Sequence, residues 1–383
     1  MTSRNIIFII NTKLTRNDVI KFGCEFYKKK NHKVFYFNLI PITRNNYYRN
    51  YNSEKLADLD NHKLISNLDN FDNDISNYLN PIIFVILPVK NIHTQKIFEI
   101  LNKKKLNYYS INSGLLPIPT LHKSELLYHA IFNPFIALKK LIKKNQNIKM
   151  TNFKPKIIFT NNDNKKNKVI KTYKIPTYDY DQIIKWENEN KQNNFDEKNY
   201  FVFLETPYSH PDGLFAEGRF PPEKPCNFDN WYSPLNKFLN NFSKLKKTKI
   251  ITIPHPRSTD KALKAISVGH TSYQNKIKLI FSSNGVFTFA SSALSIAVYF
   301  NKPIIFLNQK NFTFHNKRNI RYLSNFFNTK PLDMNEKLTL EKINSRLLIN
   351  KKSYEKFKYE YLGFPSNQTS YEKISKLIEN NII

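Results

Sequence analysis

The sequence predicts an α/β protein built from two Rossmann-type domains that face a central cleft. The chain of 383 residues is longer than a domain with one ordinary hydrophobic core, and it suits two domains of about 150–200 residues each. Short apolar runs rich in β-branched residues alternate with segments of helical periodicity, which is typical of parallel sheets covered by helices on both faces. One strongly polar stretch, residues 185–199, divides the chain, and the alternation restarts after it.

The N-terminal domain is expected over residues 1–184. A helix is expected from 17 to 30, and the strongest helical pattern covers 124–144, where Pro134 should kink or split it. The strands are expected at 6–10, 34–40, 81–89, 106–111 and 156–160.

After the linker at 185–199, the second domain is expected over residues 200–352. A long helix is expected between Trp231 and Leu245, where six apolar residues share one face, and a shorter helix at 293–300. The strands of this domain are expected at 200–205, 249–253, 278–281, 286–289 and 303–307.

Residues 353–383 are expected to form a helical tail, with two short helical patterns separated by Gly363-Phe364-Pro365. Two doubly wound domains joined by one linker leave a cleft between them. Because ligands bind outside the carboxyl ends of the strands in such sheets, chemistry is expected just after the strands.

The charge of the chain favours an anionic partner. Sixty Lys and Arg against 30 Asp and Glu give a formal net charge of +30, which attracts nucleic acid, a phospholipid surface or phosphorylated substrates. An A+T-rich genome, indicated by the many Asn, Lys, Ile, Phe and Tyr residues, would also raise the lysine content. Lysine runs end several helical patterns, where they complement the helix dipole. Since no nucleic-acid-binding motif accompanies them, we expect no nucleic-acid partner.

The compartment is expected to be the cytoplasm. The two cysteines, Cys24 and Cys226, form no CxxC pair or Cys/His cluster, so a zinc site and a disulfide framework are not indicated. The apolar run at 6–10 is too short for a signal peptide and is expected to be a strand. No stretch reaches the ~18 apolar residues of a membrane span. Contact with the inner membrane is therefore expected to be peripheral.

His255 is the first candidate for chemistry. A run of β-branched residues ends in Pro254-His255-Pro256-Arg257-Ser258. The two prolines restrict the backbone and prevent a sheet or helix from continuing there. A rigid imidazole at a strand end is suited to donate a proton or to bind an anion. Arg257 adds a guanidinium group, which can bind phosphate through two N–H groups. The alternative is a proline-rich turn with an incidental histidine.

The serine pair Ser291-Ser292 is the second candidate. It stands between the strand expected at 286–289 and the helix expected at 293–300. One of the two serines would be the helix N-cap, and the free N–H groups of the first turn would form an anion site without a glycine motif. The alternative is simple capping with no ligand.

Two acids form the third candidate. Glu205 ends the strand expected at 200–205, and Asp212 follows in a Pro-Asp-Gly turn. A carboxylate beside the cleft can act as general base toward an acceptor hydroxyl. Asp212-Gly213 is also an ordinary turn signal, so a structural role stays open.

Together these segments resemble bacterial glycosyltransferases of the GT-B fold, closest to the sialyltransferases and polysialyltransferases of capsule and lipooligosaccharide synthesis. Those enzymes carry a His-Pro motif and a serine pair, which match His255-Pro256 and Ser291-Ser292 in kind and order. Their acidic-acidic-Gly motif matches only partly, because Pro211 stands where a second acid is expected before Asp212. The resemblance covers roughly residues 200–310.

The resemblance implies a GT-B fold whose C-terminal domain binds a nucleotide sugar, with a CMP-linked donor among the candidates. His255 would protonate or bind the leaving phosphate, and Ser291 and Ser292 would hold it, beside Pro256, Arg257 and Ser258. Asp212, or else Glu205, would deprotonate a glycan acceptor that is lipid-linked in such pathways. The reaction would be a direct displacement with inversion, without a metal or other cofactor.

Two other functions stay open: a nucleotide-sugar epimerase on the same fold, and a non-catalytic protein of polysaccharide assembly. Metal binding is also considered, because Asp-X-Asp occurs at 58–60, 72–74 and 179–181. The first two are expected in polar loops, and the third lies near the domain junction. Chance matches are unsurprising in a chain this rich in Asp and Asn, so no metal is expected.

Overall fold

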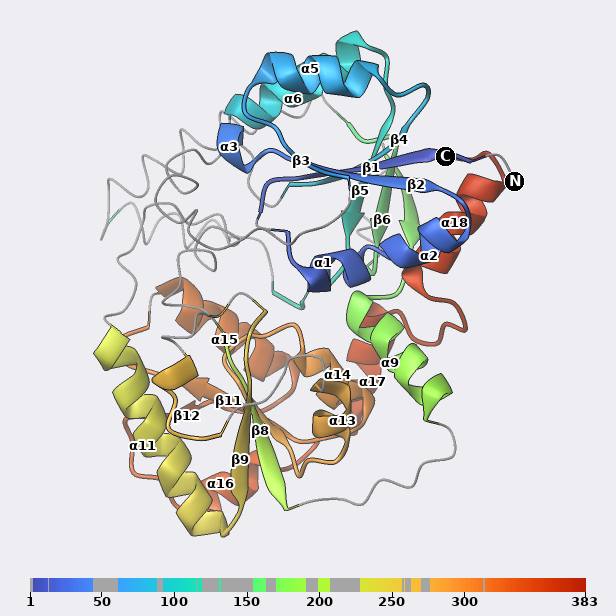
Figure 1. Cartoon of the computed structure of the whole chain (residues 1–383). Helices are drawn as coiled ribbons and strands as arrows, with labels where there is room; N and C mark the ends of the chain where they lie inside the picture. The colour runs from blue at the N-terminus through green and yellow to red at the C-terminus, as the bar shows by residue number, and fades with distance from the viewer. Residues whose placement is uncertain are drawn as a thin grey trace.

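A computed structural model describes most of the chain. The described residues are 3–12, 14–43, 61–87, 92–114, 116–118, 131, 154–162, 170–190, 199–206, 228–256, 258, 263–269, 276–312 and 314–383. Within them the chain forms two separate parallel sheets, each packed against helices, one above the other in Figure 1. This confirms the predicted α/β fold with two Rossmann-type domains.

The first sheet joins seven strands of the described chain in the order β3-β2-β1-β4-β5-β6-β7, all parallel. The strands are β1 (Asn5–Ile10), β2 (Lys33–Asn38), β3 (His62–Leu64), β4 (Ile82–Ile86), β5 (Tyr108–Asn112), β6 (Ile157–Thr160) and β7 (Lys171–Lys174). The central strand β1 is apolar after Asn5 because both of its faces are covered. The strand predicted at 34–40 is shorter than expected, since the chain turns into α3 (Ile40–Thr43) after Asn38.

Helices cover both faces of this sheet. One face packs against α1 (Arg16–Lys21), α2 (Cys24–Lys29) and the C-terminal α18 (Ser370–Glu379), and the other against α5 (Leu68–Ser76) and α6 (Ile92–Lys103). The single helix predicted at 17–30 is two helices, because Gly23 between them has φ 70°. The helix predicted at 124–144 lies outside the described residues, apart from Ile131.

The second sheet has the order β12-β11-β10-β8-β9 and is also parallel. Its strands are β8 (Tyr200–Leu204), β9 (Lys249–Ile253), β10 (Val286–Thr288), β11 (Ile304–Asn308) and β12 (Leu332–Asp333). The surrounding helices are α11 (Phe228–Lys246), α13 (Lys276–Phe281), α14 (Leu294–Tyr299), α15 (Phe314–Phe326), α16 (Leu340–Arg346), α17 (Lys351–Phe357) and the π-helix η3 (Lys358–Leu362). In the described part of the chain, no helix is long and apolar enough to cross a membrane.

One predicted strand of this domain is wrong. Residues 278–281 belong to helix α13, whose Ile277 and Ile280 are buried three residues apart on one face. A short apolar run does not distinguish a buried strand from a buried helix by periodicity alone. The helix predicted between Trp231 and Leu245 is confirmed as α11, although Leu245 is exposed.

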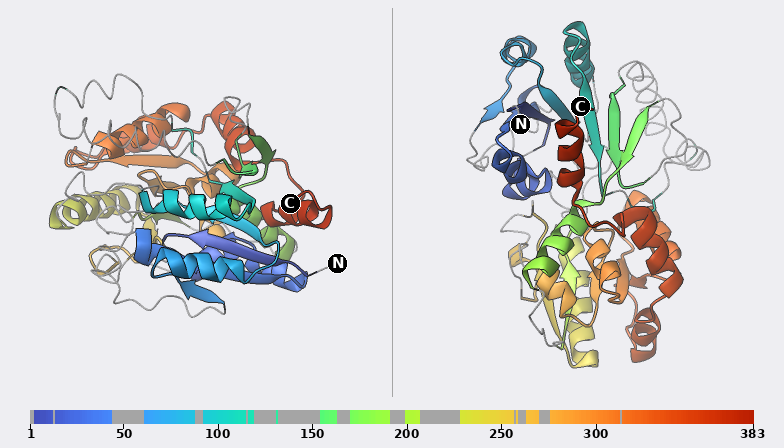
Figure 2. Two further views of the ribbon diagram at one scale, coloured as in Figure 1. Left: turned by 90° about the horizontal axis from the view of Figure 1, so that it is seen from above. Right: turned by 90° about the vertical axis from the view of Figure 1, so that its right-hand side faces the viewer.

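The two domains meet at α9 (Tyr178–Glu189), which continues as helix into the first residues of the predicted linker. The tail then crosses between them. Helix α17 and η3 pack on the second core, whereas α18 returns to the first, where it lies beside α1 and α2 on one face of the sheet (Figure 2). At the crossing, Gly363 has φ 88° and lies against the backbone of Pro176, which precedes α9.

Replacing Gly363 by Ala should loosen this crossing. A Cβ would meet Pro176 Cα at 2.6 Å, and a left-handed backbone costs an alanine about 1–2 kcal/mol before any clash. We expect the melting temperature of Gly363→Ala to fall clearly. Gly269→Ala is the matched control, because a Cβ there meets nothing within 4 Å. Equal melting temperatures for the two variants would contradict the close packing at the crossing.

Candidate functional site

Three predicted site residues follow three adjacent strands of the second sheet. Glu205 comes after β8, His255 two residues after β9, and Ser291 three residues after β10. The parallel register pairs Leu204 with both Ile253 and Thr288, so the carboxyl ends of the three strands meet at one edge. The fold therefore brings the candidates of three separate segments to one side of the sheet.

Glu205 holds the His-Pro turn in place. The side chain is buried, and its Oε2 accepts the backbone N–H of His255 at 2.7 Å and the hydroxyl of Ser258. A backbone bond from Ser258 N–H to the His255 carbonyl, 2.9 Å long, closes the turn. Both hydrogen bonds that Glu205 accepts come from residues of the His-Pro turn. This geometry assigns Glu205 to positioning the turn, and its predicted role as general base stays a prediction.

The charge state of Glu205 depends on burial. Burial raises the pKa of this carboxyl, and the hydrogen bonds from Ser258 and the His255 backbone lower it in part. Its second oxygen, Oε1, is also buried and has no hydrogen-bond partner among the residues that the structure describes. A carboxylate so enclosed binds its proton more readily than an exposed one.

The side chains of the His-Pro turn lie at the surface of this edge. His255, Pro256 and Ser258 are half-buried, which leaves part of each accessible. The Ser258 hydroxyl donates to the Glu205 carboxylate and so ties the turn to the residue that follows β8. Two further predicted residues, Asp212 and Arg257, lie outside the described residues.

The serine pair forms a tight turn rather than the N-cap itself. Helix α14 begins at Leu294, and its N-cap, Ala293, has no side-chain cap. Ser291 lies two residues earlier, where its N–H donates to Thr288 Oγ1 at 3.1 Å and its Oγ accepts the Ala293 N–H at 3.3 Å. The predicted N-cap is displaced because i to i+3 bonds form this turn before the helix begins. Ser292 is exposed at the same edge.

The sequence analysis missed a buried ion pair next to this turn. Lys276 Nζ on α13 lies 2.6 Å from Asp179 Oδ1 on α9. The other oxygen of Asp179 accepts the hydroxyl of Ser295, at 3.0 Å, and Ser295 stands four residues after Ser291. No motif includes Lys276, so only the fold could reveal this contact.

The Asp-X-Asp pairs do not converge on a common site. Asp181 on α9 binds the backbone and hydroxyl of Ser370 on α18, away from the Asp179 cluster. Asp72 and Asp74 lie in helix α5 rather than in the predicted loop, and form ion pairs with Lys104 and Lys63, each at 2.6 Å. Residues 58–60 lie outside the described residues. Among the described residues no three His, Cys, Asp or Glu side chains gather in a metal-binding group.

Comparisons with known proteins support the fold. No protein-family profile matches the chain, and no curated protein sequence matches it. Among solved structures, S. aureus MnaA in complex with UDP is 11% identical with a TM-score of 0.52, over 99% of this chain and 97% of that one. A putative UDP-N-acetylglucosamine 2-epimerase from Listeria monocytogenes is 12% identical with a TM-score of 0.52, over 100% and 97%.

A glycosyltransferase is also among these structures. Phytolacca americana UGT2, solved with UDP-2-fluoro-glucose and pterostilbene, is 9% identical with a TM-score of 0.51, over 99% of this chain and all of that one. At such identities the likeness concerns the fold alone. It establishes the GT-B arrangement of two Rossmann-type domains, which confirms the predicted fold class.

Removing the Glu205 carboxylate should destabilise the His-Pro turn. Glu205→Ala leaves two donors without their acceptor, and each buried unsatisfied group costs about 1–3 kcal/mol. Glu205→Gln keeps one acceptor oxygen and should cost less. Denaturant unfolding of both variants and the wild type at pH 7 measures the difference. An alanine variant as stable as the wild type would contradict the positioning role.

The Glu205→Gln variant should also change the pH dependence of stability. Because the folded protein raises the pKa of Glu205, it binds this proton more tightly than the unfolded chain does. That contribution is complete below the ordinary glutamate pKa and is lost as pH rises through the raised value. The stability difference between wild type and Glu205→Gln should therefore shift against the wild type from pH 4 toward pH 8. A difference independent of pH would count against this assignment.

Proposed function

We propose that this chain is a glycosyltransferase that takes a sugar from a nucleotide donor bound to its second domain. One observation carries the proposal: adjacent parallel strands bring His255 and the serine turn to the carboxyl edge of the sheet, on either side of Glu205. Ligands bind at this edge in doubly wound sheets. Three structures of the same fold support it, two of them complexes with UDP or a UDP-sugar.

The roles of the residues follow from their chemistry. The His255 imidazole protonates or binds the departing phosphate, and the hydroxyls and N–H groups of the Ser291-Ser292 turn hold the same phosphate. Pro256 and Ser258 shape the His-Pro turn, and Arg257 adds a second cation for the phosphate. The acceptor hydroxyl attacks the anomeric carbon directly, with inversion and without a metal. Asp212 is the general base that the motif resemblance favours.

The finer identity rests on the motifs. His255-Pro256 and Ser291-Ser292 favour the sialyltransferase-like group, with a sialic-acid-like sugar on a CMP-linked donor, for capsule or lipopolysaccharide synthesis. The test is a thermal-shift screen against CMP-, UDP-, GDP- and dTDP-linked sugars, because a bound ligand raises the melting temperature by mass action. Stabilisation by CMP-linked sugars alone supports this identity, and no shift with any of the four overturns donor binding.

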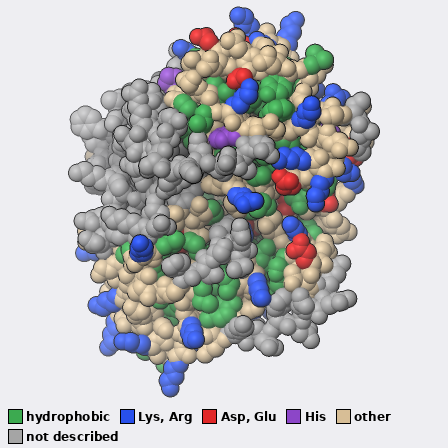
Figure 3. All heavy atoms as spheres, in the orientation of Figure 1, with side chains coloured by type: hydrophobic (Ala, Val, Ile, Leu, Met, Phe, Trp, Pro, Cys, Tyr) green, Lys and Arg blue, Asp and Glu red, His purple; other side chains and the backbone are tan. Residues whose placement is uncertain are grey.

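A lipid-linked acceptor would place the enzyme in the cytoplasm, peripherally on the inner membrane. The net charge of +30 favours an anionic surface. On the face shown in Figure 3, Lys and Arg side chains spread over the described part without forming one dense patch, and few acids accompany them. Binding to anionic vesicles at low salt, lost as the salt rises past physiological strength, is the expected result. Absence of binding at low salt would remove this idea.

An epimerase is the second candidate, because one structure of comparable likeness is the putative UDP-N-acetylglucosamine 2-epimerase from Listeria monocytogenes. The two activities differ in their need for an acceptor. If the protein converts the nucleotide sugar without any acceptor, and the configuration of the sugar changes, the epimerase is established. Donor binding without any turnover would instead favour a non-catalytic assembly protein.

Replacing His255 should impair turnover more than folding. The residue is half-buried beyond the strand end, so His255→Ala should change the melting temperature little. Loss of a general acid lowers the rate by about 10²–10⁴. His93→Ala, an exposed histidine on α6, is the control and should retain full activity. An active His255→Ala enzyme, or one that simply unfolds, would return His255 to a structural role.

The serine turn is tested by two double variants. In Ser291→Ala with Ser292→Ala, each lost hydrogen bond to a charged phosphate costs roughly 1.5–3 kcal/mol, or about ten- to a hundredfold in donor affinity. Aspartate at both positions suits a helix start, so stability should hold, while its charge repels the phosphate. Nucleotide titration and melting temperature separate these effects. Normal donor binding by a stable aspartate variant would refute the phosphate assignment.

A further inference from the structure

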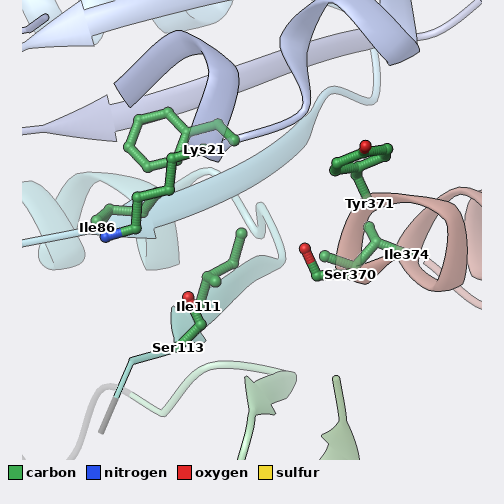
Figure 4. A pocket seen from close by; sticks show the side chains of 8 residues that line it. Lys21, Ile86, Ile111, Ser113, Ser370, Tyr371 and Ile374 are labelled. Carbon is green, nitrogen blue, oxygen red and sulfur yellow. The ribbon is translucent and has the colours of Figure 1, made fainter. Parts of the chain in front are cut away.

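A small cavity lies at the carboxyl edge of the first sheet, apart from the His-Pro turn. It encloses about 30 Å³, room for a group the size of one or two water molecules. Strand ends β4 and β5, helix α1 and the first turn of α18 form its walls (Figure 4). The lining residues are Lys21, Phe22, Ile86, Ile111, Ser113, Ser370, Tyr371 and Ile374.

Ser370 connects this cavity to a buried carboxyl group. Figure 4 shows the side chains of Ser370 and Ile111 facing one another across the cavity. The Ser370 hydroxyl donates to Asp181 Oδ2, and the Ser370 N–H donates to Asp181 Oδ1 at 2.8 Å. Asp181 itself is fully buried. A hydroxyl group in the cavity can therefore donate to Ser370 Oγ while the serine proton points at the carboxylate.

The same helical turn links the cavity to the donor side. Asp179 and Asp181 both stand in the first turn of α9, two positions apart, and therefore point in different directions. Asp179 binds Lys276 and Ser295 of the second domain, and Ser295 stands four residues after Ser291. One turn of helix thus contacts both the cavity wall and the helix that follows the serine turn.

We propose that Ser370 and Asp181 form a proton relay for the acceptor, with the acceptor hydroxyl entering this cavity. The proposal rests on the glycosyltransfer proposed above and assigns the acceptor proton to Asp181 in place of Asp212, the base that the motif resemblance favours. As the acceptor oxygen bonds to the anomeric carbon, its O–H bond breaks and its proton passes to Ser370 Oγ. The serine proton passes to Asp181 Oδ2. The bond from the anomeric carbon to the phosphate oxygen breaks, and its electron pair leaves with the nucleotide.

The electrostatic surroundings suit a base that works near neutral pH. Burial raises the pKa of Asp181 to about 8, and the two bonds from Ser370 lower it in part. The charged neighbours on α18 oppose one another, since Glu372 raises this pKa and Lys373 lowers it. Three tyrosines also lie near enough to interact electrostatically with the group, Tyr27 on α2, Tyr180 on α9 and Tyr371 on α18. A general base is most efficient when its pKa lies close to the working pH.

Two variants and a matched control test the relay. Asp181→Asn removes the proton acceptor, and Ser370→Ala removes the relay hydroxyl but keeps the backbone bond to Asp181. Ser375→Ala is the control, a buried serine of the same helix whose hydroxyl donates to Glu379 at 3.1 Å. The measurements are kcat for sugar transfer, its pH profile, donor affinity by titration and melting temperature.

The expected result is a fall in kcat of about 10²–10⁴ for Asp181→Asn and at least about tenfold for Ser370→Ala. Donor affinity should stay within about twofold, because neither residue is assigned to the donor. Ser375→Ala should match the wild type. In the wild type, kcat should rise with pH to a plateau above about 8, because the carboxyl must be deprotonated, and this rise should be absent from Asp181→Asn.

Different outcomes separate the failure of the relay from the failure of the proposed function. A fully active Ser370→Ala enzyme overturns the relay, whatever happens to Asp181→Asn, since Asp181 would then only anchor α18. Two inactive variants that have also lost donor affinity or unfolded, alongside a normal Ser375→Ala, overturn it as well. A wild-type protein that binds nucleotide sugars but transfers none overturns the proposed glycosyltransferase and the relay with it.

Discussion

The arrangement of the two domains depends on the contacts that the first turn of α9 makes. Its Asp179 is buried against Lys276 and Ser295 of the second domain, and its Asp181 against Ser370 of the returning tail. The Lys276 ammonium also lies 5.0 Å from the centre of the Tyr178 ring. Breaking a buried ion pair by removing one partner typically costs about 3–5 kcal/mol, because the other charge stays buried without compensation. Such a junction has a strongly preferred geometry.

The C-terminal tail adds a second connection at this junction. Beside the Asp181 contact, Thr177 N–H donates to the Leu362 carbonyl at 3.0 Å, and the Asn161 side chain donates to the Tyr361 carbonyl. The chain therefore crosses between the domains once through α9 and again between η3 and α18. Two crossings restrict relative movement of the domains more than a single linker would. The candidate donor edge and the small cavity are placed relative to each other by these contacts.

The fold alone does not select the reaction. Structures of comparable likeness include both a plant UGT2 and a putative epimerase, and one architecture commonly hosts several chemistries. The proposed transfer rests instead on the side chains at the strand ends. Glu205 fixes the His-Pro turn through the backbone N–H of His255, so this residue stands on a rigid support. The serine turn is similarly fixed by Thr288.

Much of the fold and part of the site could be predicted from the sequence. Apolar runs such as 6–10 and the one within 200–205 identified interior strands, because strands buried on both faces are apolar almost throughout. The edge strands β3 and β7 escaped prediction, since half-exposed strands such as Lys171–Lys174 carry no apolar run. The segment 278–281 was misassigned because a run of that length fits a helix equally well.

The sequence by itself determined which residues end the strands, and hence that His255 and the serine pair lie at one edge of a parallel sheet. This follows from local pattern and from the rule that parallel strands share their carboxyl edge. Only the tertiary structure decided the partners of Glu205, Asp179 and Asp181. Their contacts join residues 50 to 189 positions apart, and no local propensity encodes such pairings. Packing of α9 and the tail between the domains created them, because buried carboxylates must find donors wherever the fold supplies them.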